Sequence, residues 1–144
     1  IIKNGGTIDK FMGDCIMAFW NAPIDDPKHE ENAVQAAIDM QKELIVLNKE
    51  LETEGLPQIN IGIGINTGEA LVGNMGSSQR FDYSVIGDDV NLASRLESSS
   101  KTLGKTLVIG EKTVKGAKHN YNFDYVDEIT VKGKTEKIKV YTTT

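Results

Sequence analysis

The chain opens with two apolar runs on either side of a glycine. Residues 15–20 are apolar at every position, which is the pattern of a strand covered on both faces, and the other run lies in residues 7–12. Gly13 gives the backbone the freedom for a tight reversal, so we predict a hairpin with Asp14 at its lip. The preceding residues 1–6 end in two glycines, a pattern typical of a helix end, and suggest that a further piece lies upstream.

A long amphipathic helix is predicted after this hairpin. Asp25 and Asp26 offer a cap, Pro27 suits the first helical position, and the glycine and proline of residues 55–57 mark the end. Apolar residues recur at alternating spacings of four and three, and we expect the face that they form to pack into the core: Ala33, Ala37, Met40, Leu44, Leu47 and Leu51.

Isoleucine then alternates with glycine or asparagine over residues 59–66. This period of two predicts a strand with one buried face and one face bare enough for a neighbouring backbone to approach closely. Residues 66–68 form a turn into residues 70–75, which we expect to be the hairpin partner of this strand. The glycine spacing is one residue too long for a GxGxxG dinucleotide site, and a hairpin is the wrong context for it.

The second half of the chain is predicted to contain short strands and helices. We expect a strand over residues 81–86. Asp88 or Asp89 can cap a helix over residues 90–97, in which Leu92 and Leu96 form a buried pair. Residues 98–104 are predicted to be a loop. Further strands are expected at 106–109 and 121–125, a short helix at 111–115, and a hairpin that joins 128–131 to 137–141. The exposed face of the last strand, taken as an edge strand, carries Lys137 and Lys139.

Composition narrows the class of protein. The chain has 144 residues and 39% hydrophobic content, enough for one α+β domain over residues 1–144. A net charge of −5 argues against a nucleic-acid surface. Cys15 is the only cysteine, which suits a reducing compartment such as the cytoplasm. No apolar run reaches the roughly 18 residues of a membrane span, so we expect no membrane contact from this stretch, although a parent protein can carry an anchor elsewhere.

Three places offer candidate chemistry. Asp14 is either a turn former that bonds its own backbone or a hard ligand for Mg²⁺ or Mn²⁺. Asn91 and Arg95 are four residues apart near a helix start, so they share a face that suits an anion, or they are ordinary surface residues. Lys132 and Lys134 flank a glycine in a turn, where ammonium groups can meet a phosphate.

Four motifs in order resemble the class III nucleotidyl cyclase catalytic domain. They are Gly-Thr-Ile-Asp-Lys-Phe-Met-Gly-Asp at residues 6–14, Gly-Ile-Asn-Thr-Gly at 64–68, Ile-Gly-Asp-Asp-Val-Asn-Leu-Ala-Ser-Arg at 86–95, and Val-Lys-Gly-Lys at 131–134. The resemblance covers essentially the whole chain. It implies a ferredoxin-like α+β fold with a mainly antiparallel sheet, here lacking its N-terminal segment, that works as a homodimer with active sites at the subunit interface.

The resemblance also implies a reaction and residue roles. The 3′ hydroxyl of a nucleoside triphosphate attacks the α-phosphorus and expels pyrophosphate, with two Mg²⁺ or Mn²⁺ ions in the complete domain. Asp14 matches the second of two metal-binding aspartates, and Arg95 matches the arginine that stabilises charge on the phosphate. Asn91 matches the asparagine that orients the ribose, and Lys132 matches the lysine that grips the terminal phosphates.

Base choice in this family depends on two positions, which are Lys10 and Ser84 here. Lysine can donate to adenine N1, and the serine hydroxyl can accept from the adenine amino group as the more common threonine or aspartate does. Guanine-selective members have glutamate and cysteine. The resemblance therefore favours ATP and an adenylate cyclase, with a guanylate cyclase as the weaker alternative.

Two positions depart from the family pattern. No aspartate in this chain matches the first metal aspartate, which lies in an upstream strand of the family, and Glu69 stands where some relatives have an arginine. We interpret Glu69 as a tolerated variation. Because one carboxylate does not hold two ions in place, we expect residues 1–144 alone to be inactive or weakly active. A non-catalytic module that binds nucleotide or dimerises is the alternative function.

Overall fold

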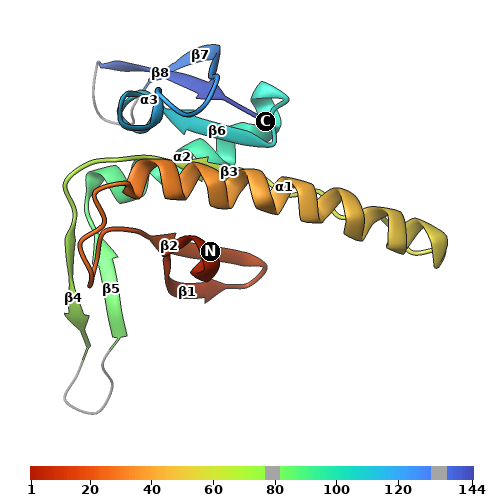
Figure 1. The fold of residues 1–144 in the computed structure, drawn as a ribbon, viewed down its shortest axis with the longest axis horizontal. Helices are drawn as coiled ribbons and strands as arrows, with labels where there is room; N and C mark the ends of the chain where they lie inside the picture. Colours follow the sequence, from red (N-terminus) through yellow and green to blue (C-terminus); the bar gives the residue numbers. More distant parts are fainter. Residues whose placement is uncertain (77–81, 131–135) are drawn as a thin grey trace.

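Three α-helices are interspersed among the strands of the described chain. The structure, a computed structural model, describes residues 1–76, 82–130 and 136–144 (Figure 1). A 3₁₀ turn, η1 (Ile2–Asn4), comes first. The strands are β1 (Thr7–Met12), β2 (Cys15–Phe19), β3 (Ile63–Ile65), β4 (Leu71–Met75), β5 (Asp82–Ile86), β6 (Leu107–Gly110), β7 (Asp124–Thr130) and β8 (Lys137–Thr142). The helices are α1 (His29–Thr53), α2 (Asp88–Leu103) and α3 (Glu111–Ala117).

The described strands form one four-stranded sheet and two hairpins. The four-stranded sheet has the order β3-β6-β8-β7, and β1 pairs with β2 and β4 with β5. Only β3 and β6 run parallel among these pairs, so the sheet is mixed and mainly antiparallel. The predicted α+β class is confirmed.

Strand β6 is the centre of the core. All four of its residues are buried, as predicted for this apolar run. Leu107 and Ile109 pack with α1 and α3 residues, whereas Val108 packs with Leu96 of α2 and Val140 of β8. Because alternate residues of a strand point to opposite faces, α1 and α2 cover opposite faces of this sheet.

The opening hairpin forms as predicted, with Gly13 at φ 62° and Gly5 at φ 83° after the 3₁₀ turn. The prediction that residues 15–20 are covered on both faces is wrong. Ile16 is 51% exposed, because this run lines an open cavity between β2 and the larger sheet.

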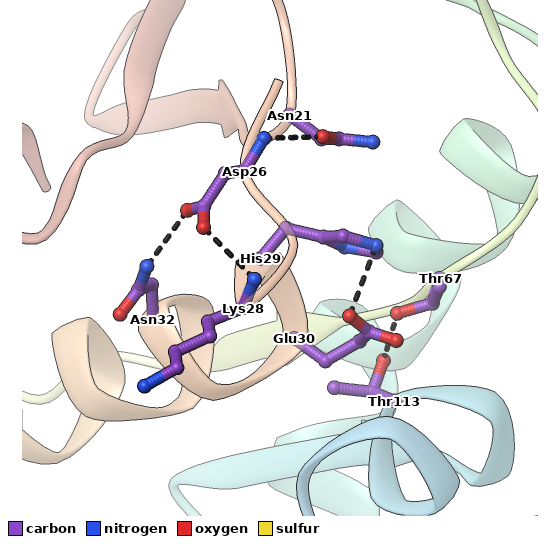
Figure 2. Close-up of polar contacts among 8 residues, drawn as sticks. All are labelled: Asn21, Asp26, Lys28, His29, Glu30, Asn32, Thr67 and Thr113. Carbon is purple, nitrogen blue, oxygen red and sulfur yellow. Dashed lines mark hydrogen bonds and ion pairs between the residues drawn. The ribbon is translucent and has the colours of Figure 1, made fainter. Parts of the chain in front are cut away.

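Helix α1 begins two residues later than predicted. Asp26 closes the turn before the helix by accepting bonds at 2.9 Å from the Lys28 N–H and at 2.7 Å from the Asn32 side-chain amide (Figure 2). The first half of the predicted apolar face is buried, including Ala33 and Ala37. The second half extends past the sheet (Figure 1), so Leu47 is 40% exposed.

The glycine face of β3 is close to α2, as predicted. A methyl group added at Gly64 would overlap with the backbone of Ala93 and Glu97, and one added at Gly62 would overlap with Ser100. The predicted hairpin partner is wrong, however. Strand β3 pairs in parallel with β6, and β4 pairs instead with β5.

Helix α2 is longer than predicted, and the predicted loop over residues 98–104 is wrong. The Ser98 and Ser99 hydroxyls donate to the carbonyl oxygens four residues earlier, at 3.1 and 2.8 Å, so these hydroxyls find hydrogen-bond partners within the helix. The predicted aspartate cap is also wrong. Gly87 occupies the N-cap position without a side-chain cap bond, and both aspartates lie in the first turn.

The C-terminal hairpin forms as predicted from β7 and β8, but β8 is not an edge strand. It pairs with β7 over its length and with β6 through Val140 and Tyr141. Lys137 and Lys139 are exposed where β8 pairs with β7 alone. The prediction of two separate strands at 121–125 and 128–131 is wrong, because one strand, β7, runs from Asp124 to Thr130. Tyr121 lies before it and packs against α1 through a 2.8 Å bond to Gln35. In the described part of the chain, none of the helices combines the length and apolarity needed to cross a membrane.

Candidate active site

The β1–β2 hairpin carries Lys10 on its first strand and Asp14 in its turn. Lys10 is opposite Met17 in the register, and its side chain is 48% exposed. Asp14 follows Gly13 and is exposed. Solvent and ligands can therefore reach both side chains.

A buried carboxylate joins this hairpin to β5. The pairing of β1 with β2 shifts between Ile8 and Lys10, so Asp9 has no register partner on β2. Ser84 Oγ donates to the two Asp9 carboxylate oxygens at 3.0 and 2.9 Å, and the Val85 N–H donates to Oδ2 at 3.2 Å. Lys10 Nζ lies 4.0 Å from Asp9 Oδ1. Asp9 thus connects the two residues predicted to select the base.

Helix α2 presents Asn91 and Arg95 to solvent. Both are exposed, and they lie away from Leu92 and Leu96, which pack into the core. Among the described residues, the Arg95 guanidinium makes no ion pair. Asn91 and Arg95 therefore lie on the exposed part of α2, and a role of this pair in binding an anion stays a prediction.

The structure does not gather the predicted residues in one pocket. A cavity of about 490 Å³ lies between β2 and β3, bounded also by the start of α1 and by α2. Lys10, Ser84, Asn91 and Arg95 do not line it. Among the described residues, no hydrogen bond or ion pair joins Lys10 or Ser84, the pair predicted to select the base, to Asn91 or Arg95. Lys132 lies outside the described residues.

Metal binding rests on one candidate. Among the described residues, no group of three His, Cys, Asp or Glu side chains comes together that could hold an ion. Asp14 offers a single exposed carboxylate, a suitable oxygen ligand for Mg²⁺ or Mn²⁺ but not a complete site. Asp14 alone therefore does not complete a two-ion centre.

Asp9 is the residue that sequence reasoning missed. Its signal is an aspartate inside a predicted strand, where a carboxylate is expensive to bury unless it is hydrogen-bonded. Its side chain is only 1% exposed. Period-two alternation gives no sign of the register shift that directs Asp9 toward β5.

The fold and this surface define an α+β nucleotidyl cyclase domain. Residues 7–144 match the adenylate and guanylate cyclase catalytic domain, and the chain belongs to that family. Members generally use divalent metal ions and act on nucleotides. The predicted family and fold are thereby confirmed.

Three similar proteins include cyclases of both kinds. The adenylate cyclase of Anabaena cylindrica is 39% identical over an alignment of 148 positions, which covers 98% of this chain and 28% of that protein. The crystal structure of the adenylyl cyclase CyaB from P. aeruginosa has a TM-score of 0.88 at 37% identity and covers 99% of this chain and 74% of that chain. The crystal structure of the guanylyl cyclase Cya2 has a TM-score of 0.86 at 34% identity, with coverages of 97% and 70%.

Proposed function

We propose that this chain is the catalytic domain of an adenylate cyclase that converts ATP to 3′,5′-cyclic AMP and pyrophosphate. The observation that carries the proposal is the link through Asp9. It holds Ser84 at 2.9 and 3.0 Å and lies 4.0 Å from the Lys10 ammonium, so the two base-selecting positions are neighbours. Sequence alone places them 74 residues apart, from position 10 to position 84.

The chemistry of these two side chains favours adenine. The Lys10 ammonium is a donor and suits adenine N1, which is an acceptor. The Ser84 oxygen can accept a bond from the amino group at C6 of adenine, whereas guanine carries an acceptor oxygen there. A guanylate cyclase therefore stays the weaker assignment, and it is the one that the likeness to Cya2 supports.

Arg95, Asn91 and Lys132 are assigned to the ribose and the triphosphate. In the reaction the ribose O3′ forms a bond to the α-phosphorus, and the bond from that phosphorus to the pyrophosphate oxygen breaks. The Arg95 guanidinium can donate to the oxygens on which charge develops, and Asn91 can position the ribose. Lys132 would hold the terminal phosphates. The exposure of Asn91 and Arg95 on α2 is consistent with these contacts.

Placement on open surfaces supports a homodimeric active site. Lys10 and Arg95 are exposed and lie outside the cavity, so a single copy does not enclose a nucleotide with them. A second copy packed head to tail would bring the base-selecting pair of one subunit against α2 of the other. The partners are then ATP and a second catalytic domain.

Asp14 is proposed as one ligand of a site for Mg²⁺ or Mn²⁺. When bound, divalent ions neutralise phosphate charge and favour ionisation of the attacking hydroxyl. A further carboxylate would be needed to complete such a site.

The test is Mn²⁺-dependent formation of cyclic AMP by the full-length protein. We expect activity in the wild type, loss of at least about a hundredfold in Asp14→Ala, and little change in Asp25→Ala, a matched exposed aspartate in a loop. Equal product from the wild type and Asp14→Ala would refute the role of Asp14. Binding of ATP without any turnover would favour the second candidate, a nucleotide-binding and dimerising module, to which the single matched metal carboxylate points.

A swap of the base-selecting residues tests ATP against GTP. The double variant Lys10→Glu, Ser84→Cys carries the residues of guanine-selective relatives. We expect it to shift the ratio of kcat/KM for ATP and GTP toward GTP by about tenfold or more. An unchanged ratio in a folded variant would show that these positions do not select the base.

A further inference from the structure

The Asp9 carboxylate accepts the hydrogen bond from the single hydrogen of the Ser84 hydroxyl. A serine hydroxyl has one donor hydrogen and two acceptor lone pairs, whereas an ionised carboxylate only accepts. With Ser84 Oγ at 3.0 and 2.9 Å from the two Asp9 oxygens, the hydroxyl hydrogen points to Asp9. What Ser84 can still offer a ligand is a lone pair.

The surroundings keep this arrangement in place. The Val85 N–H donates to Asp9 Oδ2 at 3.2 Å, and Lys10 Nζ lies 4.0 Å from Oδ1, so backbone and charge both hold the carboxylate. The Asp9 side chain is 1% exposed and Ser84 is 6% exposed, which leaves water little access to compete for the bond. A register shift of this kind re-aims a side chain, and the shift in β1 directs the side chain of Asp9 toward β5.

We propose that Asp9 is a positioning residue that determines nucleotide specificity by fixing Ser84 as a hydrogen-bond acceptor. The inference rests on the proposed function, since it concerns the base that this surface selects. A group that binds the Ser84 oxygen must then donate, as the 6-amino group of adenine does. The 6-oxo group of guanine is an acceptor, so it would face a lone pair and is disfavoured.

The test compares ATP with GTP in the full-length protein. In Asp9→Asn the side-chain amide can donate to Ser84 Oγ, which frees the hydroxyl hydrogen to turn toward a ligand. We expect the ratio of kcat/KM for ATP over GTP to fall by about tenfold. Asp39→Asn is the matched control, because Asp39 also accepts two side-chain bonds, from Asn4 at 3.1 Å and Gln35 at 2.9 Å, and it should leave the ratio unchanged.

If Asp9 only stabilised the fold, the effect of Asp9→Asn on the ATP-over-GTP ratio of kcat/KM would not depend on the Ser84 hydroxyl. If Asp9 acts through the hydroxyl, Asp9→Asn has no further effect on the ratio in a Ser84→Ala background. An unchanged ratio in folded Asp9→Asn, or an equal change with and without the Ser84 hydroxyl, would overturn the proposal. Thermal unfolding checks the fold, and Asp9→Ala, which removes the acceptor of the Ser84 hydrogen, replaces Asp9→Asn if the latter does not fold.

A measurement of nucleotide binding tests this inference independently of the proposed function. The ratio of dissociation constants for ATP and GTP is measured on the same variants, and it should fall in Asp9→Asn together with the kinetic ratio. If the wild type forms no cyclic AMP from ATP, the proposed function is wrong, while the binding ratio still decides the role of Asp9. A fall that depends on the Ser84 hydroxyl supports that role, and its absence overturns it.

Discussion

The side-chain amide of Asn66 donates to both the carbonyl oxygen and the Oδ1 of Asp89, at 3.0 and 3.2 Å. This contact ties the segment after β3 to the first turn of α2, the helix that carries Asn91 and Arg95. Gly68 leaves no room for a side chain against the Asp89 carboxylate, and Gly110 leaves none against Asn66 Oδ1. This contact adds to the packing of Leu96 against Val108 in holding α2 on the larger sheet.

Removal of the Asn66 amide should weaken the position of α2. We expect Asn66→Ala to lower the free energy of unfolding by about 1–3 kcal/mol, because Asp89 loses two bonds in a partly buried place. It should also lower kcat of the full-length protein by roughly tenfold or more through displacement of Asn91 and Arg95. Urea denaturation and cyclic AMP formation measure the two effects.

Asn48 offers a matched control for this variant. Its side chain also makes two hydrogen bonds, both to the backbone of Ile59 at 2.9 and 2.7 Å, but it lies on α1. Asn48→Ala should cost stability without a change in kcat. Equal losses of kcat in the two variants would contradict a specific role for the contact with Asp89.

Gly64 and Gly73 should respond in opposite ways to the same substitution. An added methyl group at Gly64 overlaps with backbone atoms of Ala93 and Glu97, whereas at Gly73 it meets nothing within 4 Å. Gly64→Ala should therefore destabilise by about 3 kcal/mol or prevent folding. Gly73→Ala should leave stability unchanged or raise it by about 0.5 kcal/mol. Similar denaturation midpoints for both variants would show that β3 and α2 are not packed this closely.

Local patterns in the sequence predicted elements better than pairings. The four-residue buried run of β6, the Leu92 and Leu96 pair and the Gly13 reversal all depend on neighbours within a few positions. The partner of β3 does not, because Ile63 pairs with Leu107 across more than forty residues. The turn at residues 66–68 suggested a local hairpin, but Asn66 hydrogen-bonds with Asp89 and Thr67 with Thr113, so the chain continues toward α2 and α3.

The sequence predicted the individual residues of the candidate site but not the hydrogen bonds that join them. Family motifs pointed to Lys10, Ser84, Asn91 and Arg95, and their spacing gave the shared face on α2. The role of Asp9 depends on a register shift in β1 and on a contact with a strand that lies 75 residues away. Neither the register shift nor the contact produces a periodic pattern in the sequence, so the role of Asp9 is seen only in the structure, where β1 lies against β5.

Asp39 gives the fold a defined response to acid. Hydrogen bonds from Asn4 and then from Gln35 lower the pKa of Asp39 below its usual value. Gln35 in turn accepts from the Tyr121 hydroxyl at 2.8 Å, so the network joins the N-terminal turn, α1 and the segment before β7. Since the pKa is lower in the folded state, the stabilisation is present above the unfolded value of about 3.9 and is lost as pH falls through the folded value.

Asp39→Asn should remove this acid dependence. We expect the wild type to be more stable than the variant at pH 6, with the difference shrinking as pH falls below about 4. Urea denaturation at a series of pH values measures it. The Asp25→Asn variant, at an exposed loop position, is the control and should keep the acid dependence of the wild type. A stability difference that grows as pH falls would contradict the direction of the Asp39 pKa shift.

Residues 1–144 on their own should form little or no cyclic AMP. Asp14 is the only carboxylate in them that matches the metal-binding pair of the family, and it is exposed at the hairpin turn. One carboxylate can contribute to holding an ion but cannot place two ions around a phosphate, and every 1.4 kcal/mol of lost transition-state stabilisation slows the reaction about tenfold.

The measurement is Mn²⁺-dependent product formation by this stretch and by the full-length protein at equal concentration, with circular dichroism to check folding. Because Lys10 and Ser84 are both present, the short chain should still bind ATP more tightly than GTP. Turnover equal to that of the full-length protein would show that Asp14 does not need a second carboxylate and that the metal site has been assigned wrongly.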